Sequence, residues 1–376
     1  MDLIKLPGLI SLRRKDQFMI FELSQPGRVL STSFLNGGCR EDIAYLFNYC
    51  EVYNSPDGRC EMRAPTNGEH LSLIANELKL PPHETTGLST AAMMKYARPN
   101  TEKFRDFSVT ALATAGIDVN GSRAGDPACW HEKAGVPTPV EPGTINIFLF
   151  IDASLDAGAL AKALVTATEA KTAALQELLA PSCTSSGLAT GSGTDGAIIV
   201  SNLQSPTALT DAGHHSKLGE YIGRVVKKTV KEALVADIGF RNYACGSVLK
   251  RMKRFGLHEA KMFALYQSAA ADREIGQEQF SRALKAVDSD DRYIGIATLY
   301  AHLLDLLHWN LIGRDEASRL AALLLSDLAN LSGYPLPGLS MPLPADRQGP
   351  ALLPEAFAAN WALLAAKNSS ANKQEK

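Results

Sequence analysis

The side chains that could do chemistry gather between residues 143 and 195, in segments that otherwise resemble packed core. Thr144 opens a run of apolar residues, Glu169 and Lys171 lie in an Ala-rich stretch, and Asp195 ends a Gly-rich one. His215 follows soon after. Unpaired polar groups cost free energy when they are buried, so a role other than packing is expected for them. A hydroxyl, two carboxylates, an ammonium and an imidazole together would suit nucleophilic or acid–base catalysis.

Thr144 is the candidate nucleophile, because it is the first residue of a buried strand and directly follows Pro142 and Gly143. Side chains alternate along a strand, so Thr144 and Asn146 share one side. The hydroxyl then lies at the mouth of the strand, and Asn146 is a candidate substrate-binding residue. The alternative is that Thr144 only starts the strand. The chain contains no G-x-S-x-G or H-E-x-x-H motif, which weakens the α/β-hydrolase and zinc-protease interpretations.

Glu169 and Lys171 occupy the middle of a predicted helix, within Thr168–Thr172. Residues two apart on a helix with 3.6 residues per turn point in directions about 200° apart, so these side chains cannot both face one site. We expect Glu169, ahead of Lys171, to supply a charged group to the site. Exposed surface residues are the alternative for both.

The segment from Thr190 to Asp195 alternates glycine with polar residues and leads into a predicted strand. Such a turn can present backbone N–H groups to an anion or to a developing oxyanion. Thr190, Ser192 and Thr194 are therefore candidate substrate-binding residues, and Asp195 is a candidate base. The alternative for Asp195 is an Asx-type turn stabiliser.

Two further groups are candidates. His214 and His215 precede a predicted helix and diverge too much to chelate one metal, so no metal site is predicted. One of them, His215, could act as an acid or base, while His214 contacts substrate or packs. Asn36, Gly37 and Gly38 indicate a tight turn or a close approach of backbone to a ligand, and Cys39 beside them is expected to be structural or ligand-lining.

The elements that must position these residues form a mixed α/β domain with a partly antiparallel sheet and layered helices, followed by an all-helical domain. Strands are predicted over 17–23 and 28–34, which form a hairpin, and over 107–114, 144–151 and 197–200. Helices are predicted over 41–49, 70–78, 89–97, 155–179 with Ser154 as its cap, and 216–236. Residues 120–142 form a long loop that could act as a lid.

Domain boundaries follow from the change in composition after Gly239. We expect the site-bearing domain over 1–239 and a helical domain of unknown role over 240–334. The remainder, 335–376, is predicted to hold a Pro-rich linker, a short helix over 355–366 and a disordered tail.

Composition excludes several classes of protein. A net charge of −2 argues against a general nucleic-acid binder. No apolar run of about 20 residues is present, so no membrane span is expected. Six widely spaced cysteines without a C-x-x-C pair indicate free thiols and a cytoplasmic protein.

Four blocks of sequence, over 31–42, 109–127, 143–200 and 211–234, closely resemble the adenosylcobinamide amidohydrolases. Thr-Glu-Ala-Lys at 168–171 matches the family residue for residue, and Ser192 replaces a Thr of the family's turn. The resemblance covers about residues 18–236. It implies hydrolysis of the amide that joins aminopropanol to the corrin ring, which yields adenosylcobyric acid for cobamide salvage. The corrinoid is then the substrate, and no cofactor is implied.

Two other functions stay open. One is a corrinoid-binding or trafficking protein without hydrolase activity, although a binder would not need Thr144, Glu169, Lys171 and Asp195. The other is a self-processing peptidase or acyltransferase, because Gly143-Thr144 and the elements after it resemble, more weakly, self-processing aminopeptidases and ornithine acetyltransferases. In those enzymes a Ser or Thr becomes a new N-terminus and attacks a carbonyl.

Overall fold

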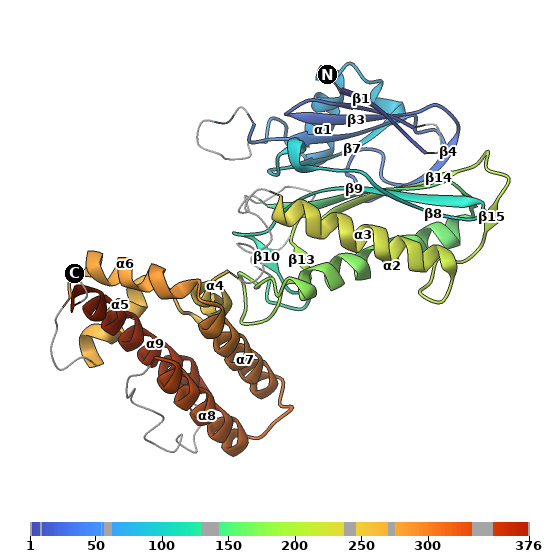
Figure 1. The fold of residues 1–376 in the computed structure, drawn as a ribbon. Coiled ribbons are helices and arrows are strands. Elements are labelled where there is room, and N and C mark those ends of the chain that lie inside the picture. The colour runs from blue at the N-terminus through green and yellow to red at the C-terminus, as the bar shows by residue number, and fades with distance from the viewer. Residues whose placement is uncertain are drawn as a thin grey trace. The chain divides into compact units, whose positions relative to one another are not determined.

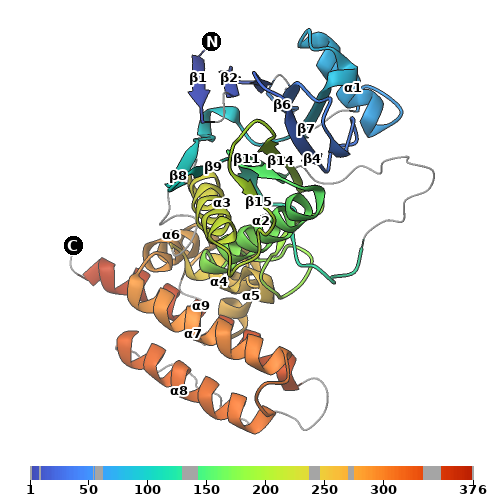
Figure 2. The same cartoon turned by 90° about the vertical axis from the view of Figure 1, so that its right-hand side faces the viewer.

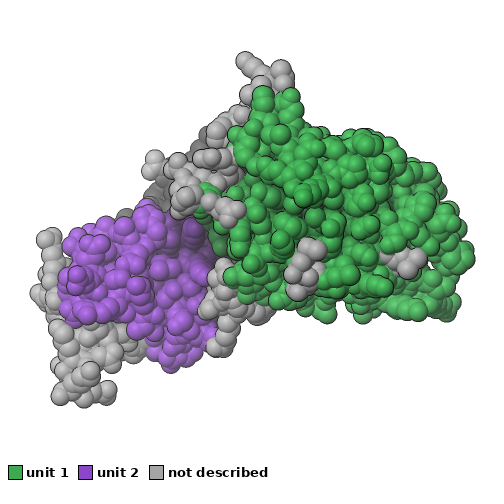
Figure 3. Space-filling view, turned by 90° about the horizontal axis from the view of Figure 1, so that it is seen from above, with its two compact units in different colours: residues 1–239 green, residues 240–376 purple. Residues whose placement is uncertain are grey.

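The computed structural model describes residues 2–7, 10–53, 55, 62–128, 143–236, 246–269, 275–332 and 349–374, with side chains of 354–366 in the last range. The chain divides into two compact units, Met1–Gly239 and Phe240–Lys376 (Figure 3). No helix within the described ranges combines the length and the apolar content needed to cross a bilayer.

The first unit begins with a five-stranded sheet in the order β1-β2-β3-β6-β7. Its strands are β1 (Asp2–Leu6), β2 (Ile10–Arg14), β3 (Phe18–Leu23), β6 (Tyr45–Cys50) and β7 (Thr85–Thr90). Within this sheet, β6 and β7 pair in parallel and the other neighbours pair antiparallel. Helix α1 (Asn67–Glu77), which begins with a capping box from Thr66 to Glu69, packs Leu71 and Ile74 against Ile20 and Phe47 on one face of this sheet.

A second sheet of six strands lies against the other face and carries the candidate site (Figure 1). Its order is β5-β4-β14-β11-β9-β8. The strands are β4 (Gly27–Ser31), β5 (Gly38–Arg40), β8 (Asn100–Phe104), β9 (Phe107–Gly116), β11 (Thr144–Ile151) and β14 (Gly196–Asn202). The two sheets share an apolar core in which Phe21 stacks on Phe148 at 4.8 Å between ring centroids.

Helices α2 (Ala157–Glu177) and α3 (Lys217–Val235) cover the far face of the second sheet, so the unit has helix, sheet, sheet and helix layers (Figure 1). Helix α2 connects β11 to β14, the one parallel pair in this sheet. A parallel pair needs such a crossover, because its second strand must start again at the edge where the first began. The central strands β9, β11, β14 and β4 can be followed across Figure 2.

Short elements complete this unit. The 3₁₀ turns are η1 (Pro82–Glu84) and η2 (Met94–Tyr96). Two ladders of two residues each join β10 (Gly121–Ser122) to β13 (Gly191–Ser192), and β12 (Ser154–Leu155) to β15 (Ala208–Leu209).

The mixed α/β class and the helical class of the C-terminal region are confirmed, and so are several elements. The strand predicted over 144–151 matches β11, and those over 107–114 and 197–200 lie within β9 and β14. Helices predicted over 70–78, 155–179 and 216–236 correspond to α1, α2 and α3. The cap of α2 is Asp156, whose carboxylate accepts from Ala159 N at 2.7 Å, and not Ser154, which lies in β12.

Three other predictions were wrong. The segments 17–23 and 28–34 do not form a hairpin, because β3 and β4 belong to different sheets. The helices predicted over 41–49 and 89–97 are absent: these segments contain β6, the end of β7 and η2. Tyr45–Cys50 pairs on both sides with other strands, and this tertiary pairing overrides its local helical pattern. Residues 129–142 of the predicted loop over 120–142 lie outside the described residues.

The second unit is helical throughout its described residues. Its helices are α4 (Val248–Met252), α5 (Glu259–Ala269), α6 (Gln277–Asp288), α7 (Asp291–His308), α8 (Arg314–Ser332) and α9 (Gly349–Gln374), with a 3₁₀ turn η4 (Lys253–Phe255) after α4. Tyr300, Phe280, Phe357 and Trp361 are fully buried in one core. Helix α9 is longer than the short helix expected over 355–366 and includes most of the expected tail. The residues of the Pro-rich segment up to position 348 lie outside the described residues.

Candidate active site

The site lies at one edge of the six-stranded sheet, where β11 and β14 begin. Because these two strands are parallel, their amino ends meet at the same edge, and Asn146 pairs with Gly196 in the register. The neighbouring strands β9 and β4 run the other way, so their carboxyl ends arrive there. Thr144 is thus paired with Gly116 of β9. On the other side, Thr32 follows β4 and exchanges backbone and side-chain hydrogen bonds with Ala197 of β14.

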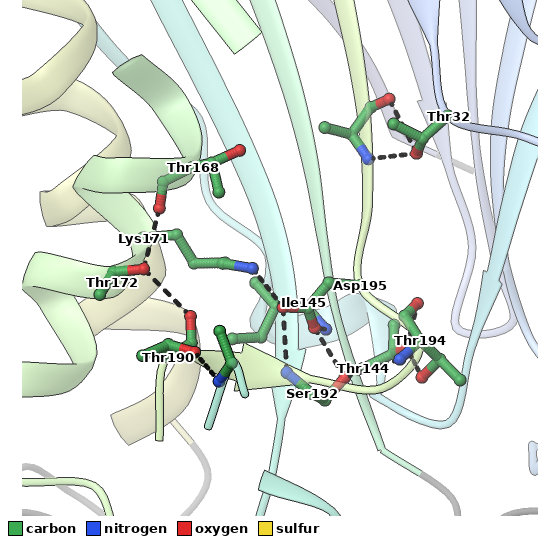
Figure 4. Close-up of polar contacts among 12 residues, drawn as sticks. Thr32, Thr144, Ile145, Thr168, Lys171, Thr172, Thr190, Ser192, Thr194 and Asp195 are labelled. Carbon is green, nitrogen blue, oxygen red and sulfur yellow. Dashed lines mark hydrogen bonds and ion pairs between the residues drawn. The ribbon is translucent and has the colours of Figure 1, made fainter. Parts of the chain in front are cut away.

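The Asp195 carboxylate is the centre of the hydrogen bonding at this edge (Figure 4). It accepts from Ile145 N at 3.0 Å, Ser192 N at 3.0 Å and Ser192 Oγ at 2.7 Å, and it forms an ion pair with Lys171 Nζ. The Lys171 and Asp195 side chains are only 12% and 14% exposed. The carboxylate therefore fixes the 192–195 turn to β11 and to α2 at once, which is the turn-stabilising role considered for it.

The Thr144 hydroxyl lies beside this turn and is buried, with the residue 3% exposed. Thr144 Oγ1 donates to Thr194 O at 2.8 Å and also lies in close contact with Thr194 Oγ1. Asn146, on the same side of β11, donates from Nδ2 to Asn48 Oδ1 at 2.9 Å and to Ser89 O at 2.9 Å. Its amide nitrogen therefore links β11 to β6 and β7 of the other sheet.

The carbonyl of Gly143 receives several donors. Thr194 Oγ1 donates to it at 2.7 Å, Ser192 Oγ at 3.5 Å, and Asn120 Nδ2 also donates to it. Gly143 has a φ of +152°, and a Cβ there would lie 2.3 Å from Asn120 Oδ1 and 2.9 Å from Gly116 O, so only glycine fits. Sequence reasoning missed Asn120, because nothing in the pattern of a loop residue 23 positions away marks it as a partner of Gly143.

The two charged residues of the 168–172 segment separate as the helical geometry requires. Lys171 turns towards Asp195, and Thr172 Oγ1 donates to Thr190 O at 3.1 Å. Glu169 instead pairs with His214 at 2.5 Å, with side chains 54% and 61% exposed. The structure thus brings Lys171, and not the favoured Glu169, to the Asp195 carboxylate.

His215 is exposed, and within the described residues no hydrogen bond or ion pair joins Glu169, His214 or His215 to Thr144 or Asp195. In the same ranges, no group of three or more His, Cys, Asp or Glu is placed to share a metal ion.

The remaining predicted residues hold loops near the same edge. Thr190 Oγ1 accepts from Ala124 N at 2.8 Å, which joins the turn to residues after β10. Asn36 donates from Nδ2 to Pro82 O at 2.6 Å and to Thr85 O at 2.7 Å. A Cβ on Gly37 would lie 2.2 Å from Ser33 O, and Gly38 has a φ of +86°. The Asn36–Gly38 segment is therefore a tight turn after β4, while Cys39 is exposed.

A hydroxyl and hydrogen-bond donors that converge on one oxygen are among the groups that an amide hydrolase uses. A family model for adenosylcobinamide amidohydrolases (CbiZ) matches residues 5–242. A protein of Methanocaldococcus jannaschii, the uncharacterized protein MJ1613, is 39% identical over 250 residues, which cover 62% of this chain and 90% of that protein. The chain belongs to the adenosylcobinamide amidohydrolase family. Its activity is the hydrolysis of adenosylcobinamide in cobamide salvage.

Among solved structures, the chain is similar to that of the PH0078 protein from Pyrococcus horikoshii OT3. It is 14% identical, with a TM-score of 0.30 over 69% of this chain and 90% of that one.

Proposed function

We propose that Thr144 attacks the amide carbon that joins aminopropanol to the corrin ring of adenosylcobinamide, and that adenosylcobyric acid and aminopropanol are the products. The observation that carries this proposal is the position of the Thr144 hydroxyl, which lies at the mouth of β11 beside converging donors and the Lys171–Asp195 ion pair. The corrinoid is substrate, and no resident cofactor is part of the proposal.

The proposed attack forms a bond from Thr144 Oγ1 to the amide carbon, and the amide oxygen becomes an oxyanion. Thr194 Oγ1 and Asn120 Nδ2, which converge on one carbonyl oxygen in this structure, are the proposed donors to that oxyanion. The C–N bond then breaks, the aminopropanol nitrogen takes the proton that the Thr144 hydroxyl released on attack, and water hydrolyses the ester left on Thr144 to the carboxylic acid and the free hydroxyl.

Lys171 and Asp195 are proposed to act by position and charge. The carboxylate holds Ser192 and, through the turn, Thr194, while the ammonium adds a positive charge close to the developing oxyanion. Glu169, His214 and His215 lie on the solvent side, which suits contact with the polar groups of a large substrate better than the attack itself.

The test is release of aminopropanol from adenosylcobinamide, measured in the dark with the full-length protein. Thr144→Ala is expected to lower turnover by about 10³-fold or more with corrinoid binding nearly unchanged, because the hydroxyl acts only in the transition state. Thr210→Ala, at an exposed threonine away from the site, is the matched control.

Two outcomes count against this proposal. Near-normal turnover of Thr144→Ala would remove the nucleophile and favour a water activated by Asp195, Glu169 or His215. Tight corrinoid binding without aminopropanol release by the wild-type protein would leave only the binding function.

A further inference from the structure

The Gly143 carbonyl oxygen is held by the same groups that are proposed above as donors to the oxyanion of the substrate. It accepts from Thr194 Oγ1 at 2.7 Å, from Asn120 Nδ2 and, at the longer distance of 3.5 Å, from Ser192 Oγ. A buried backbone carbonyl is usually satisfied by a single such partner. Donors that converge from β13, from the turn after it and from residue 120 form the arrangement that stabilises an oxyanion during acyl transfer.

The next residue along the chain supplies a nucleophile for that carbonyl. Attack by Thr144 Oγ1 on the Gly143 carbonyl carbon closes a five-membered ring through Thr144 Cβ, Cα and N. Thr194 Oγ1 contacts the Thr144 hydroxyl and also donates to Gly143 O. One hydroxyl can therefore accept the proton of the nucleophile and pass its own proton to the carbonyl oxygen.

Access to Thr144 gives a separate argument. The residue is 3% exposed, and its hydroxyl is hydrogen-bonded within the chain, so an external amide cannot approach it while Gly143 is attached. The same Gly143 carbonyl also engages the donors proposed for the substrate.

From this geometry we propose that the chain cleaves its own backbone between Gly143 and Thr144. The new bond from Thr144 Oγ1 to the Gly143 carbon gives a tetrahedral centre with its oxygen held by Thr194 and Asn120. When that centre collapses, the C–N bond breaks and the Thr144 nitrogen takes the proton, which leaves an ester between Gly143 and the Thr144 oxygen. Water hydrolyses the ester to a Gly143 carboxylate and a Thr144 with free hydroxyl and amine.

Cleavage would complete the hydrolase. Departure of the Gly143 carbonyl frees the donors for the substrate amide, and the new amine of Thr144 is a base adjacent to its own hydroxyl. This inference deepens the proposed function, because the same hydroxyl acts in both reactions. The covalent state of the chain, however, is measured without any corrinoid.

The experiment follows the full-length protein by intact mass and N-terminal sequencing. We expect two pieces, the second beginning with Thr144-Ile145-Asn146, in place of one chain of 40.4 kDa. Thr144→Ala should stay intact, and Thr144→Ser, which keeps a hydroxyl, should be cut. Thr194→Ala should slow cleavage by about 10²-fold, the loss typical of one oxyanion donor, whereas Thr194→Ser and the control Thr210→Ala should be cut like the wild type.

A wild-type chain that folds, as shown by its circular dichroism, and stays intact on long incubation would overturn self-cleavage, and so would cleavage of Thr144→Ala at the same bond. Aminopropanol release by an intact chain would overturn this inference while leaving the proposed hydrolase standing. Cleavage at Gly143–Thr144 without aminopropanol release would support the inference and count against the proposed hydrolytic role.

Discussion

Replacing Asp195 with asparagine tests how the candidate site is held together. The substitution keeps the size of the side chain but removes the negative charge beside Lys171 and turns one acceptor into a donor. Both side chains are largely shielded from water, at 12% and 14% exposure. Solvent therefore cannot replace the lost partner of the ammonium, and one of the two backbone donors, Ile145 N or Ser192 N, loses its acceptor as well.

The expected cost follows from this burial. Removing one partner of a buried ion pair costs about 3–5 kcal/mol, and the residual exposure lowers our expectation to about 2–4 kcal/mol for Asp195→Asn. Lys171→Met removes the other charge, so the double variant should recover part of that loss. The resulting coupling energy should be about 2 kcal/mol.

The Glu169–His214 pair is the matched control, because it is also a pair from α2 but has side chains 54% and 61% exposed. Its cycle, with Glu169→Gln and His214→Gln, should give a coupling of about 0–1 kcal/mol.

The assay is urea unfolding of the full chain, followed by far-UV circular dichroism at about 0.15 M salt. Tryptophan fluorescence combines Trp130 of the first unit with Trp309 and Trp361 of the helical unit, so its comparison with circular dichroism helps to separate the two transitions. Equal coupling energies for the two pairs, or an Asp195→Asn variant as stable as the wild type, would refute the assignment of Asp195 as the residue that holds this edge.

Three further predictions concern other parts of the chain. Gly191→Ala should destabilise the first unit by about 1–3 kcal/mol and lower aminopropanol release, because the added Cβ would lie 2.3 Å from Asp195 Oδ2. Gly193→Ala is the control and should change the melting temperature little, because its added Cβ would have no atom within 4 Å. Burial raises the pKa of Asp126, but hydrogen bonds from serine and threonine hydroxyls and a backbone N–H outweigh it and leave the pKa below 3.8. The folded value is thus below the unfolded one, so Asp126→Asn should melt lower than the wild type near pH 7, with a difference that fades as pH falls below about 4. A soluble, folded fragment of residues 1–240 should retain measurable aminopropanol release, and an inactive one would show that the helical unit completes the site.

The sequence was most informative where the structure is buried on both faces. The strand over 144–151 has an apolar run bounded by Pro142-Gly143 and by Asp152, and the structure begins and ends it at the predicted residues. Helices α2 and α3 also follow from their apolar stripes, since these face a sheet. In these segments local pattern and tertiary packing agree.

Prediction failed where pairing with distant strands decides the structure. Tyr45–Cys50 forms a strand because Phe18–Leu23 and Thr85–Thr90 lie on its two sides, and no local signal gives that pairing. The same holds for the site: the angle between Glu169 and Lys171 was predictable, but which of them meets Asp195 depends on how α2 packs on the sheet. The donation from Asn120 to Gly143 also depends on the approach of two segments remote in sequence.

The strand order has a consequence for the fate of a chain cut after Gly143. The piece before the cut contributes β5, β4, β9 and β8, and the piece after it contributes β14 and β11, which lie between them as the two central strands. Neither piece can leave without the loss of the β4–β14 and β11–β9 ladders, so the severed protein should purify as one particle. Strand β14 is also synthesised after both of its neighbours, β4 and β11. Thr194 and Asp195 must therefore leave the ribosome before this edge of the sheet can assemble, and any cut must follow the synthesis of β14.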